Sequence, residues 1–367
     1  MNQEIDKFSD LKSQKNISVM IIGGGKISEQ HLIALSVLKD ITVTGICDLS
    51  PALSQFTAER FGIANWFTDY KSMLSECDAK VVHVLTPPAT HKRIVKDCLE
   101  SGRHVIVEKP IATSNKEFRE LYDFALSKGL HLIENHNYRF NRPIVDLENA
   151  VREGKIGAVK EIEVRLLLNI GGGRYADSNL PHASHQLPAG VIHEFITHLA
   201  YLLLNFLPET DVDNFDKVRA AWQNHTGGSL FKYDDLDAFI LSKDVHSRLR
   251  FSCHQWPDGF HVKICGTEGT AEAELFHPIC HITTKRSIGQ HLTPLFNSID
   301  KAKAIRRAGF RSLWNKIRNK GAYEGLGKFL ELTYKSFLNG EEPPVSFQQM
   351  DEASRLIDSL LLKENSL

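Results

Sequence analysis

The chain has 367 residues, 42% of them hydrophobic and 24% charged, which is enough apolar material for two domains with separate cores. Its 44 Lys and Arg residues balance 45 Asp and Glu residues, and the formal net charge of −1 excludes a general electrostatic attraction of the whole chain to nucleic acid or to an anionic membrane. The polar segment 1–16 is unlike a secretory or transit signal, and the six cysteines are scattered, as is typical of a reducing compartment. We therefore expect a cytoplasmic protein with no integral membrane contact.

The first part of the chain alternates between short apolar runs and amphipathic helix patterns. Runs with the length of buried strands lie at 17–22, 41–48, 81–85, 104–107 and 130–134. Helix patterns separate them, and one helix is expected to begin at Ser114, which has capping-box spacing with Glu117. Strands separated by helices cannot pair through tight hairpins. The pattern predicts a Rossmann-type, doubly wound parallel sheet in a domain over 17–140, after a polar tail at 1–16.

Beyond Pro143 the pattern changes to strands joined by turns, with fewer helices. Strands are predicted at 161–168, 238–241, 246–253 and 261–265. Helices are predicted at 190–207, 326–338 and 349–362, the last opened by a capping box of Ser346 and Gln349. This mixture predicts a C-terminal α+β domain over 141–367 with a large, mostly antiparallel open sheet.

The first predicted strand runs into Gly-Gly-Gly-Lys-Ile-Ser at 23–28, which fits the dinucleotide-binding pattern with serine in its third small position. Gly23 permits a sharp turn, and Gly25 lets the backbone approach a pyrophosphate. The helix that begins at Lys26 and Ile27 then directs its free N–H groups and positive dipole end at the anion. The alternative is a plain glycine turn between strand and helix.

Asp48 ends the second predicted strand, where an acidic side chain can bond both ribose hydroxyls of an adenosine. The same carboxylate repels a 2′-phosphate, and no arginine follows in residues 49–51. The position therefore favours NAD over NADP, the alternative being an ordinary turn aspartate.

Several further motifs follow in a recognisable order. They are Thr-Pro-Pro-Ala-Thr-His at 86–91, Glu-Lys-Pro at 108–110, Tyr-Arg-Phe at 138–140, Gly-x-x-x-acid-x-x-x-His at 190–198, Gly-Thr-Glu-Gly-Thr at 266–270 and Pro-Pro-Val-Ser at 343–346. Together they resemble the Gfo/Idh/MocA oxidoreductase family over most of the chain. The resemblance implies hydride transfer between NAD and a secondary hydroxyl or ketone of a sugar, nucleotide sugar or polyol. It also implies a homo-dimer or homo-tetramer that associates through the open sheet.

The resemblance places a set of residues at the cofactor, namely Thr86, Pro87, His91, Glu108 and Lys109. A lysine that follows a parallel strand points toward the end of the sheet where ligands bind. Beside a nicotinamide, the ammonium group of Lys109 can stabilise an alkoxide that develops on the substrate. A solvated cation at a strand end is the alternative reading of Lys109.

Glu194 and His198 lie four residues apart and share one face of a predicted helix. By the resemblance, His198 is the general acid/base, and Glu194, where the family has Asp, orients the imidazole or bonds the sugar. His193, Tyr138 and Arg139 are candidate substrate contacts. The alternatives are a structural helix histidine for His198 and a hinge brace for Tyr138 and Arg139. His193 and His198 lie about 140° apart on a helix, which does not suit a zinc pair, so no metal site is predicted.

Two segments carry weaker signals. The loop 171–174, Gly-Gly-Gly-Arg, is expected to be a flexible substrate-side loop. Residues 301–320 hold eight basic residues and no acidic one, with Phe310, Leu313, Trp314 and Ile317 at helical spacing. We expect this stripe to dock on the protein and leave the basic side chains in water. The alternative is contact with an anionic membrane, a polysaccharide precursor or a nucleotide-sugar diphosphate.

Two other functions fit the same motifs. An NAD-dependent glycosidase would keep its cofactor unconsumed through oxidation, elimination, hydration and reduction. A non-catalytic, NAD-binding regulator would keep the fold without turnover, although Lys109 and His198 argue against it.

Overall fold

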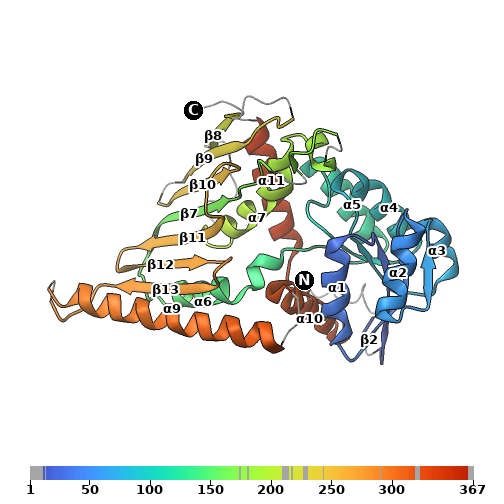
Figure 1. The fold of residues 1–367 in the computed structure, drawn as a ribbon, viewed down its shortest axis with the longest axis horizontal. Helices are drawn as coiled ribbons and strands as arrows, with labels where there is room; N and C mark the ends of the chain where they lie inside the picture. The colour runs from blue at the N-terminus through green and yellow to red at the C-terminus, as the bar shows by residue number, and fades with distance from the viewer. Residues whose placement is uncertain are drawn as a thin grey trace. The chain divides into compact units, whose positions relative to one another are not determined.

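The computed structural model describes residues 11–12, 14–172, 175–179, 182–208, 215, 218–225, 230–242, 244–289, 291–318 and 323–362 (Figure 1). The chain divides into two compact units. Unit 1 comprises Met1–Asn137 and Gly321–Ser354, and unit 2 comprises Tyr138–Lys320 and Arg355–Leu367. Most of the predicted tail, residues 1–10 and 13, lies outside the described residues.

Unit 1 contains a six-stranded sheet in the order β3-β2-β1-β4-β5-β6, with every neighbouring pair parallel. Its elements are β1 (Ile17–Ile22), α1 (Lys26–Ser36), β2 (Ile41–Cys47), α2 (Pro51–Phe61), β3 (Asn65–Phe67), α3 (Tyr70–Glu76), β4 (Val81–Val84), α4 (His91–Glu100), β5 (His104–Val107), α5 (Asn115–Ser127), β6 (Leu132–Glu134) and α10 (Glu324–Asn339). This strand order is that of the dinucleotide-binding Rossmann fold, and it confirms the predicted parallel sheet.

Burial explains why most strands of unit 1 could be predicted from the sequence, whereas β3 could not. All four residues of β4 and of β5 are buried, which is the pattern of strands covered on both faces. The strand β3 has only three residues, and none of them is buried, so no apolar run marked it. The predicted cap at Ser114 is present, because its side chain accepts a hydrogen bond from the Glu117 N–H.

Unit 2 contains a seven-stranded sheet in the order β13-β12-β11-β7-β10-β9-β8. Its elements are α6 (Arg142–Arg152), β7 (Val159–Leu167), α7 (Val191–Leu204), β8 (Val218–Gln223), β9 (Asp235–Leu241), β10 (His246–Ser252), β11 (Gly259–Gly266), β12 (Gly269–Glu274), β13 (Ile279–Thr284) and α9 (Thr293–Arg318). All neighbouring pairs are antiparallel except β10 and β7, which confirms the predicted mostly antiparallel sheet.

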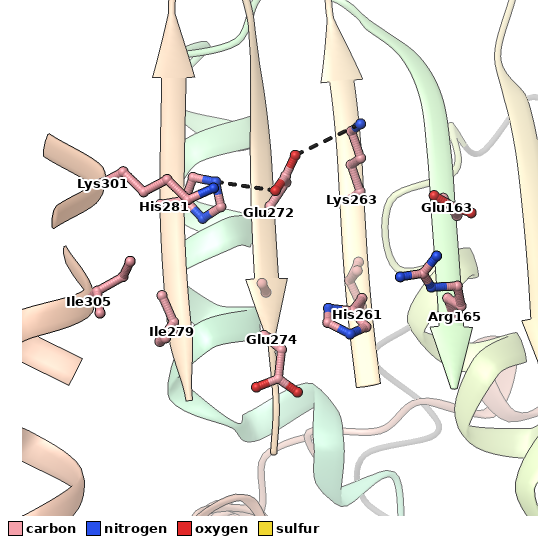
Figure 2. A pocket seen from close by; sticks show the side chains of 12 residues that line it. Glu163, Arg165, His261, Lys263, Glu272, Glu274, Ile279, His281, Lys301 and Ile305 are labelled. Atoms are coloured by element: carbon pink, nitrogen blue, oxygen red, sulfur yellow. Dashed lines mark ion pairs between the residues drawn. The ribbon is translucent and has the colours of Figure 1, made fainter. Parts of the chain in front are cut away.

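The two faces of this sheet differ in polarity. On β7 and β11, Ile162, Val164 and Val262 are fully buried. The alternate positions of these and the neighbouring strands carry charged and imidazole side chains, among them Glu163, Arg165, His261, Lys263 and Glu272, around a pocket of about 380 Å³ (Figure 2). The alternation follows from the period of two in a strand.

The C-terminal helices differ from the predicted division at residue 140. Residues 321–354 belong to unit 1, although the prediction assigned all of 141–367 to the second domain. The reason is the buried face of α10, since the Tyr334 hydroxyl bonds His83 and the Phe337 ring lies 6.0 Å from that of His104. The following helix, α11 (Phe347–Leu362), begins in unit 1 and ends in unit 2, and its predicted capping box is present.

The basic segment also departs from its prediction. It forms most of α9, which runs along the edge strand β13 (Figure 1). The apolar stripe was expected to dock on the protein, but the Phe310 and Leu313 side chains are exposed. The side chains of Trp314 and Ile317 lie outside the described part of the chain. Within the described ranges, no helix combines the length and apolar composition that crossing a bilayer requires.

Candidate functional site

The glycine turn after β1 forms an open cradle at the start of α1. Gly23 has φ +106°, and a Cβ there would lie 2.7 Å from the Leu85 carbonyl oxygen, so only glycine fits. At Gly25, by contrast, a Cβ would meet nothing within 4 Å. Gly25 is also the N-cap of α1 and provides no side-chain cap. The Ser28 N–H donates to the Gly25 carbonyl oxygen at 3.0 Å, and the N–H groups of Lys26 and Ile27 are left to an outside acceptor. An open, uncapped helix N-terminus beside an obligatory glycine fits a pyrophosphate group.

Asp48 ties the end of β2 to this turn. Its Oδ2 accepts from the Gly24 N–H and its Oδ1 from the Ser50 N–H, each at 2.8 Å. A carboxylate oxygen has a second lone pair, so both oxygens can still accept from a ribose diol. Ser28 is buried and its hydroxyl donates to the Gly25 carbonyl oxygen at 2.6 Å. The hydroxyl hydrogen of Ser28 is therefore used within the turn, and not on a phosphate.

Thr86 and Pro87 follow β4 and form the neighbouring rim. The Thr90 hydroxyl donates to the Pro87 carbonyl oxygen at 2.8 Å, and the Thr86 hydroxyl lies 2.7 Å from that of Thr90. His91 is fully buried, with its ring nitrogens 2.6 Å from the Thr86 carbonyl oxygen and 2.8 Å from that of Pro110. Burial lowers the pKa of His91 despite these two carbonyls. The structure thus corrects the predicted role of His91, which supports the two turns from beneath and has no surface to offer a cofactor.

Glu108 and Lys109 follow β5, the neighbour of β4 in the sheet, and the Lys109–Pro110 peptide is cis. Lys109 is partly exposed at the carboxyl end of its strand. Glu108 Oε1 accepts from Asn135 Nδ2 at 2.6 Å and lies 3.1 Å from His31 Nε2. Burial by itself raises the pKa of Glu108, but the hydrogen bond and charge of His31, together with Lys109 and Asn135, outweigh it and leave that pKa lowered.

Behind Glu108 lies a buried hydrogen-bonded chain that the sequence did not indicate. His31 Nδ1 lies 2.9 Å from His83 Nδ1, and His83 Nε2 lies 2.7 Å from the Tyr334 hydroxyl. Since ionised Glu108 only accepts, His31 donates to it from Nε2. When His31 carries only this proton, its Nδ1 accepts from His83 Nδ1–H, and His83 Nε2 accepts from the Tyr334 hydroxyl. Burial, with the His31 charge, lowers the pKa of His83 well below its usual value, and burial raises that of Tyr334, so both of these side chains stay neutral.

In unit 2, His198 lies on α7, a helix that is buried along most of its length against β7 and β10. His198 Nδ1 lies 2.7 Å from the Tyr201 hydroxyl, three residues further along the helix. The same hydroxyl accepts from the Tyr138 N–H at 3.2 Å, and the Tyr138 ring packs edge-on against His198. Tyr201 was missed from the sequence, although its spacing from His198 places both on one helix face.

Glu194 lies one turn before His198 and contacts a different group of residues. Its Oε1 accepts from the Tyr175 hydroxyl at 3.3 Å, and its Oε2 lies 3.8 Å from His182 Nδ1. Both partners follow the loop 171–174 that was expected to lie on the substrate side, of which Gly173 and Arg174 lie outside the described residues. Tyr201 is thus a partner of the His198 ring, and the two roles expected of Glu194, to orient the imidazole or to bond the sugar, stay predictions.

The other candidate substrate contacts are held inside unit 2. His193 is 1% exposed, and burial lowers its pKa to about 4, so it is a neutral interior side chain where a substrate contact was expected. Arg139 donates to Asn205 Oδ1 at 2.6 Å, and Asn205 in turn donates to Glu148. Tyr138 and Arg139 therefore both have partners at α7 or its C-cap within unit 2, and their roles in substrate binding or as a hinge brace stay predictions.

Comparison with known proteins finds a family match over the first part of the chain. Residues 17–136 match the family described as "Oxidoreductase family, NAD-binding Rossmann fold", GFO_IDH_MocA. Levoglucosan dehydrogenase of Pseudarthrobacter phenanthrenivorans is 29% identical over 153 residues, which is 40% of this chain and 39% of that protein. D-glucoside 3-dehydrogenase of Escherichia coli is 30% identical over 156 residues, or 42% of this chain and 44% of that protein. The matched segments thus span about two fifths of each curated relative.

A solved structure extends the likeness to the whole fold. The WlbA dehydrogenase from Bordetella pertussis, in complex with NADH and UDP-GlcNAcA, aligns with a TM-score of 0.77 over 96% of both chains. At 17% sequence identity this likeness establishes a shared fold. The family match over residues 17–136 and the strand order agree on an NAD-binding Rossmann fold like that of the Gfo/Idh/MocA oxidoreductases in this part of the chain.

Proposed function

We propose that this protein is an NAD-dependent oxidoreductase that transfers hydride between nicotinamide and a secondary hydroxyl or ketone of a sugar, nucleotide sugar or polyol. The observation that carries the proposal is the open cradle at Gly23 and Gly25, which follows β1 of a Rossmann sheet in which Lys109 follows β5. The names of the curated relatives, a levoglucosan and a D-glucoside dehydrogenase, support a carbohydrate substrate. A cytoplasmic location and a homo-dimer or homo-tetramer are further predictions.

Each residue of the cradle has a proposed part in holding NAD. The N–H groups at the start of α1 bind the pyrophosphate, and Thr86 and Pro87 line the neighbouring rim. The Asp48 carboxylate accepts from the ribose hydroxyls while it holds the Gly24 N–H. A 2′-phosphate would approach this carboxylate as a like charge, which is why NAD is favoured over NADP.

Lys109 and His198 are the proposed catalytic residues. When bound, the nicotinamide takes hydride from the substrate carbon, or returns it in reduction. Lys109 stabilises negative charge on the reacting oxygen, and His198 takes the hydroxyl proton at Nε2. For this, His198 Nδ1–H must donate to the Tyr201 hydroxyl, whose oxygen has two lone pairs and also accepts from the Tyr138 N–H. Glu194 is proposed to bond the sugar from the same helix face.

The test is a fluorescence titration with NADH and NADPH, followed by an absorbance screen of sugars, nucleotide sugars and polyols. We expect NADH to bind more tightly than NADPH. Lys109→Met should lower turnover about 10²–10³-fold, since it removes one preorganised charge from the reacting oxygen, and leave NADH affinity within about twofold. Lys116→Met, at an exposed lysine of α5, is the matched control.

The outcomes separate the alternatives. Failure to bind either dinucleotide would refute the proposed function. Glycoside cleavage without net change in nicotinamide absorbance would identify the glycosidase alternative, and tight NADH binding with no turnover on any substrate would favour a regulator. Turnover that survives in Lys109→Met would refute the role given to Lys109.

A further inference from the structure

The helix α9 exposes apolar side chains that a folded monomer normally covers. Leu295, Phe310 and Leu313 are 55%, 70% and 59% exposed, and Ile299 is also exposed. At about 100° per residue, these four side chains fall within about 60° of one another around the helix. We call them the α9 stripe. Isolated exposed apolar residues need no explanation, but an aligned row on one long helix marks an interaction surface.

The opposite side of α9 is the side that the protein covers. Ala308 is buried and points about 180° away from the middle of the α9 stripe. Lys301 and Ile305 also point away from the stripe, toward the pocket on the sheet (Figure 2). The contact of α9 with β13 therefore uses this other side and leaves the α9 stripe outward.

The charge on α9 restricts what can cover the stripe. Residues 293–318 contain seven Lys and Arg residues and a single acidic one, Asp300, in a chain whose net charge is −1. Asp300 is paired with Arg286 and lies 3.8 Å from Lys303. Arg306 lies within the arc of the stripe, and Lys303 and Arg307 lie beside it, all three exposed.

We propose that α9 binds the surface of an anionic phospholipid membrane, with the α9 stripe in the acyl boundary and the basic side chains on the headgroups. An exposed apolar row flanked by basic residues is the pattern of helices that lie in a membrane interface. Arg306 can keep its guanidinium among the headgroups while its stem lies along the apolar row. The helix would lie on the membrane and not cross it.

Other occupants fit the surface less well. A nucleic acid or an acidic polysaccharide would match the charge and leave Leu295, Phe310 and Leu313 in water. A second copy of α9 would cover the stripe, but it would bring its own excess of basic side chains into the contact. Of these occupants, an anionic membrane is the one that satisfies the apolar row and the positive charge together.

The test is flotation of the purified full chain with vesicles of phosphatidylcholine alone or mixed with phosphatidylglycerol. We expect at least about tenfold more protein on the mixed vesicles, because each basic side chain near an anionic surface contributes about 1 kcal/mol, and a loss of this binding at high salt. Phe310→Ser combined with Leu313→Ser should lower binding about tenfold or more. The matched control is Val37→Ser combined with Leu362→Ser, at side chains 75% and 84% exposed elsewhere.

A second pair of variants tests the charge. Arg306→Glu combined with Arg307→Glu should abolish the preference for anionic vesicles, whereas Lys39→Glu combined with Lys116→Glu, with the same change of net charge, should retain it. Thermal unfolding checks that each variant is folded. NADH titration of the same samples tests the proposed function separately, since neither the α9 positions nor the control positions belong to the glycine cradle.

Three outcomes would overturn the proposal. The first is equal or absent binding to both kinds of vesicle at low salt. The second is binding by the serine variant that equals that of the wild type, which would mean that charge alone acts. The third is a dimer, seen by light scattering, that the serine variant dissociates while the wild type ignores vesicles. That result would make α9 an interface between copies.

Discussion

Two buried histidines, one in each unit, are accommodated in opposite ways. His83 in unit 1 is fully buried, and both of its ring nitrogens have partners, His31 and Tyr334. His193 in unit 2 is 1% exposed, and its Nδ1 has no hydrogen-bond partner among the described residues. Burial lowers the pKa of both, so both are neutral near pH 7. The difference is that every imidazole nitrogen of the hydrogen-bonded series ending at Glu108 has a partner. Burial of His193, by contrast, leaves Nδ1 without one, which costs free energy of folding.

The largest effect should come from interrupting the hydrogen-bonded series Glu108–His31–His83–Tyr334 in unit 1. His83→Phe keeps a ring in the space but leaves His31 Nδ1 and the Tyr334 hydroxyl buried without a partner. We expect a loss of about 2–6 kcal/mol in the free energy of unfolding, at about 1–3 kcal/mol for each of the two orphaned groups. Urea unfolding at pH 7 measures it, with His246→Phe at an exposed position as control. Equal effects of the two substitutions would remove the contrast between the units.

The next effect concerns His193 and depends on pH. Below pH 6.5 the unfolded chain takes up a proton at this residue and the folded chain does not until about pH 4, so stability is lost as the pH falls through this window. The contribution amounts to about 2 kcal/mol between pH 7 and pH 5. His193→Leu should remove that part of the acid dependence and be neutral or stabilising at pH 7, because it removes an unsatisfied buried nitrogen.

Unfolding curves of wild type, His193→Leu and the exposed control His246→Leu, each at pH 7 and pH 5, measure this difference. A strongly destabilised His193→Leu at pH 7 would mean that the imidazole has a partner and that the two histidines are alike.

The smallest effect should come from Tyr334, the last member of the hydrogen-bonded series in unit 1. Tyr334→Phe leaves only His83 Nε2 unpaired, so we expect a loss of about 1 kcal/mol, smaller than that of His83→Phe. Tyr323→Phe, at a side chain 57% exposed, is the control and should have no effect. A loss from Tyr334→Phe as large as that from His83→Phe would indicate that the hydrogen bonds of the series strengthen one another cooperatively.

The sequence predicted the elements whose signals are local. The strands β1, β4 and β5, the glycine turn at 23–25 and the caps at Ser114 and Ser346 lie where the patterns indicated. The strands β8, β12 and β13 were missed, since β13 has no fully buried residue and β12 alternates alanine with glutamate. The site shows the same contrast. Sequence motifs predicted Lys109, Glu194 and His198, but no motif predicted Tyr201 or the hydrogen-bonded series behind Glu108.

What the sequence determined by itself is the alternation of strand and helix and the glycine cradle, because each depends on residues within a few positions of one another. The tertiary structure decided the partners of the buried polar groups and the covering of the helices. Tyr334 meets His83 across 251 residues of chain, and α9 turns Ala308 rather than Phe310 toward the protein. Such pairings depend on how distant surfaces fit and on which buried donor finds which acceptor, and no local spacing of residues encodes that choice.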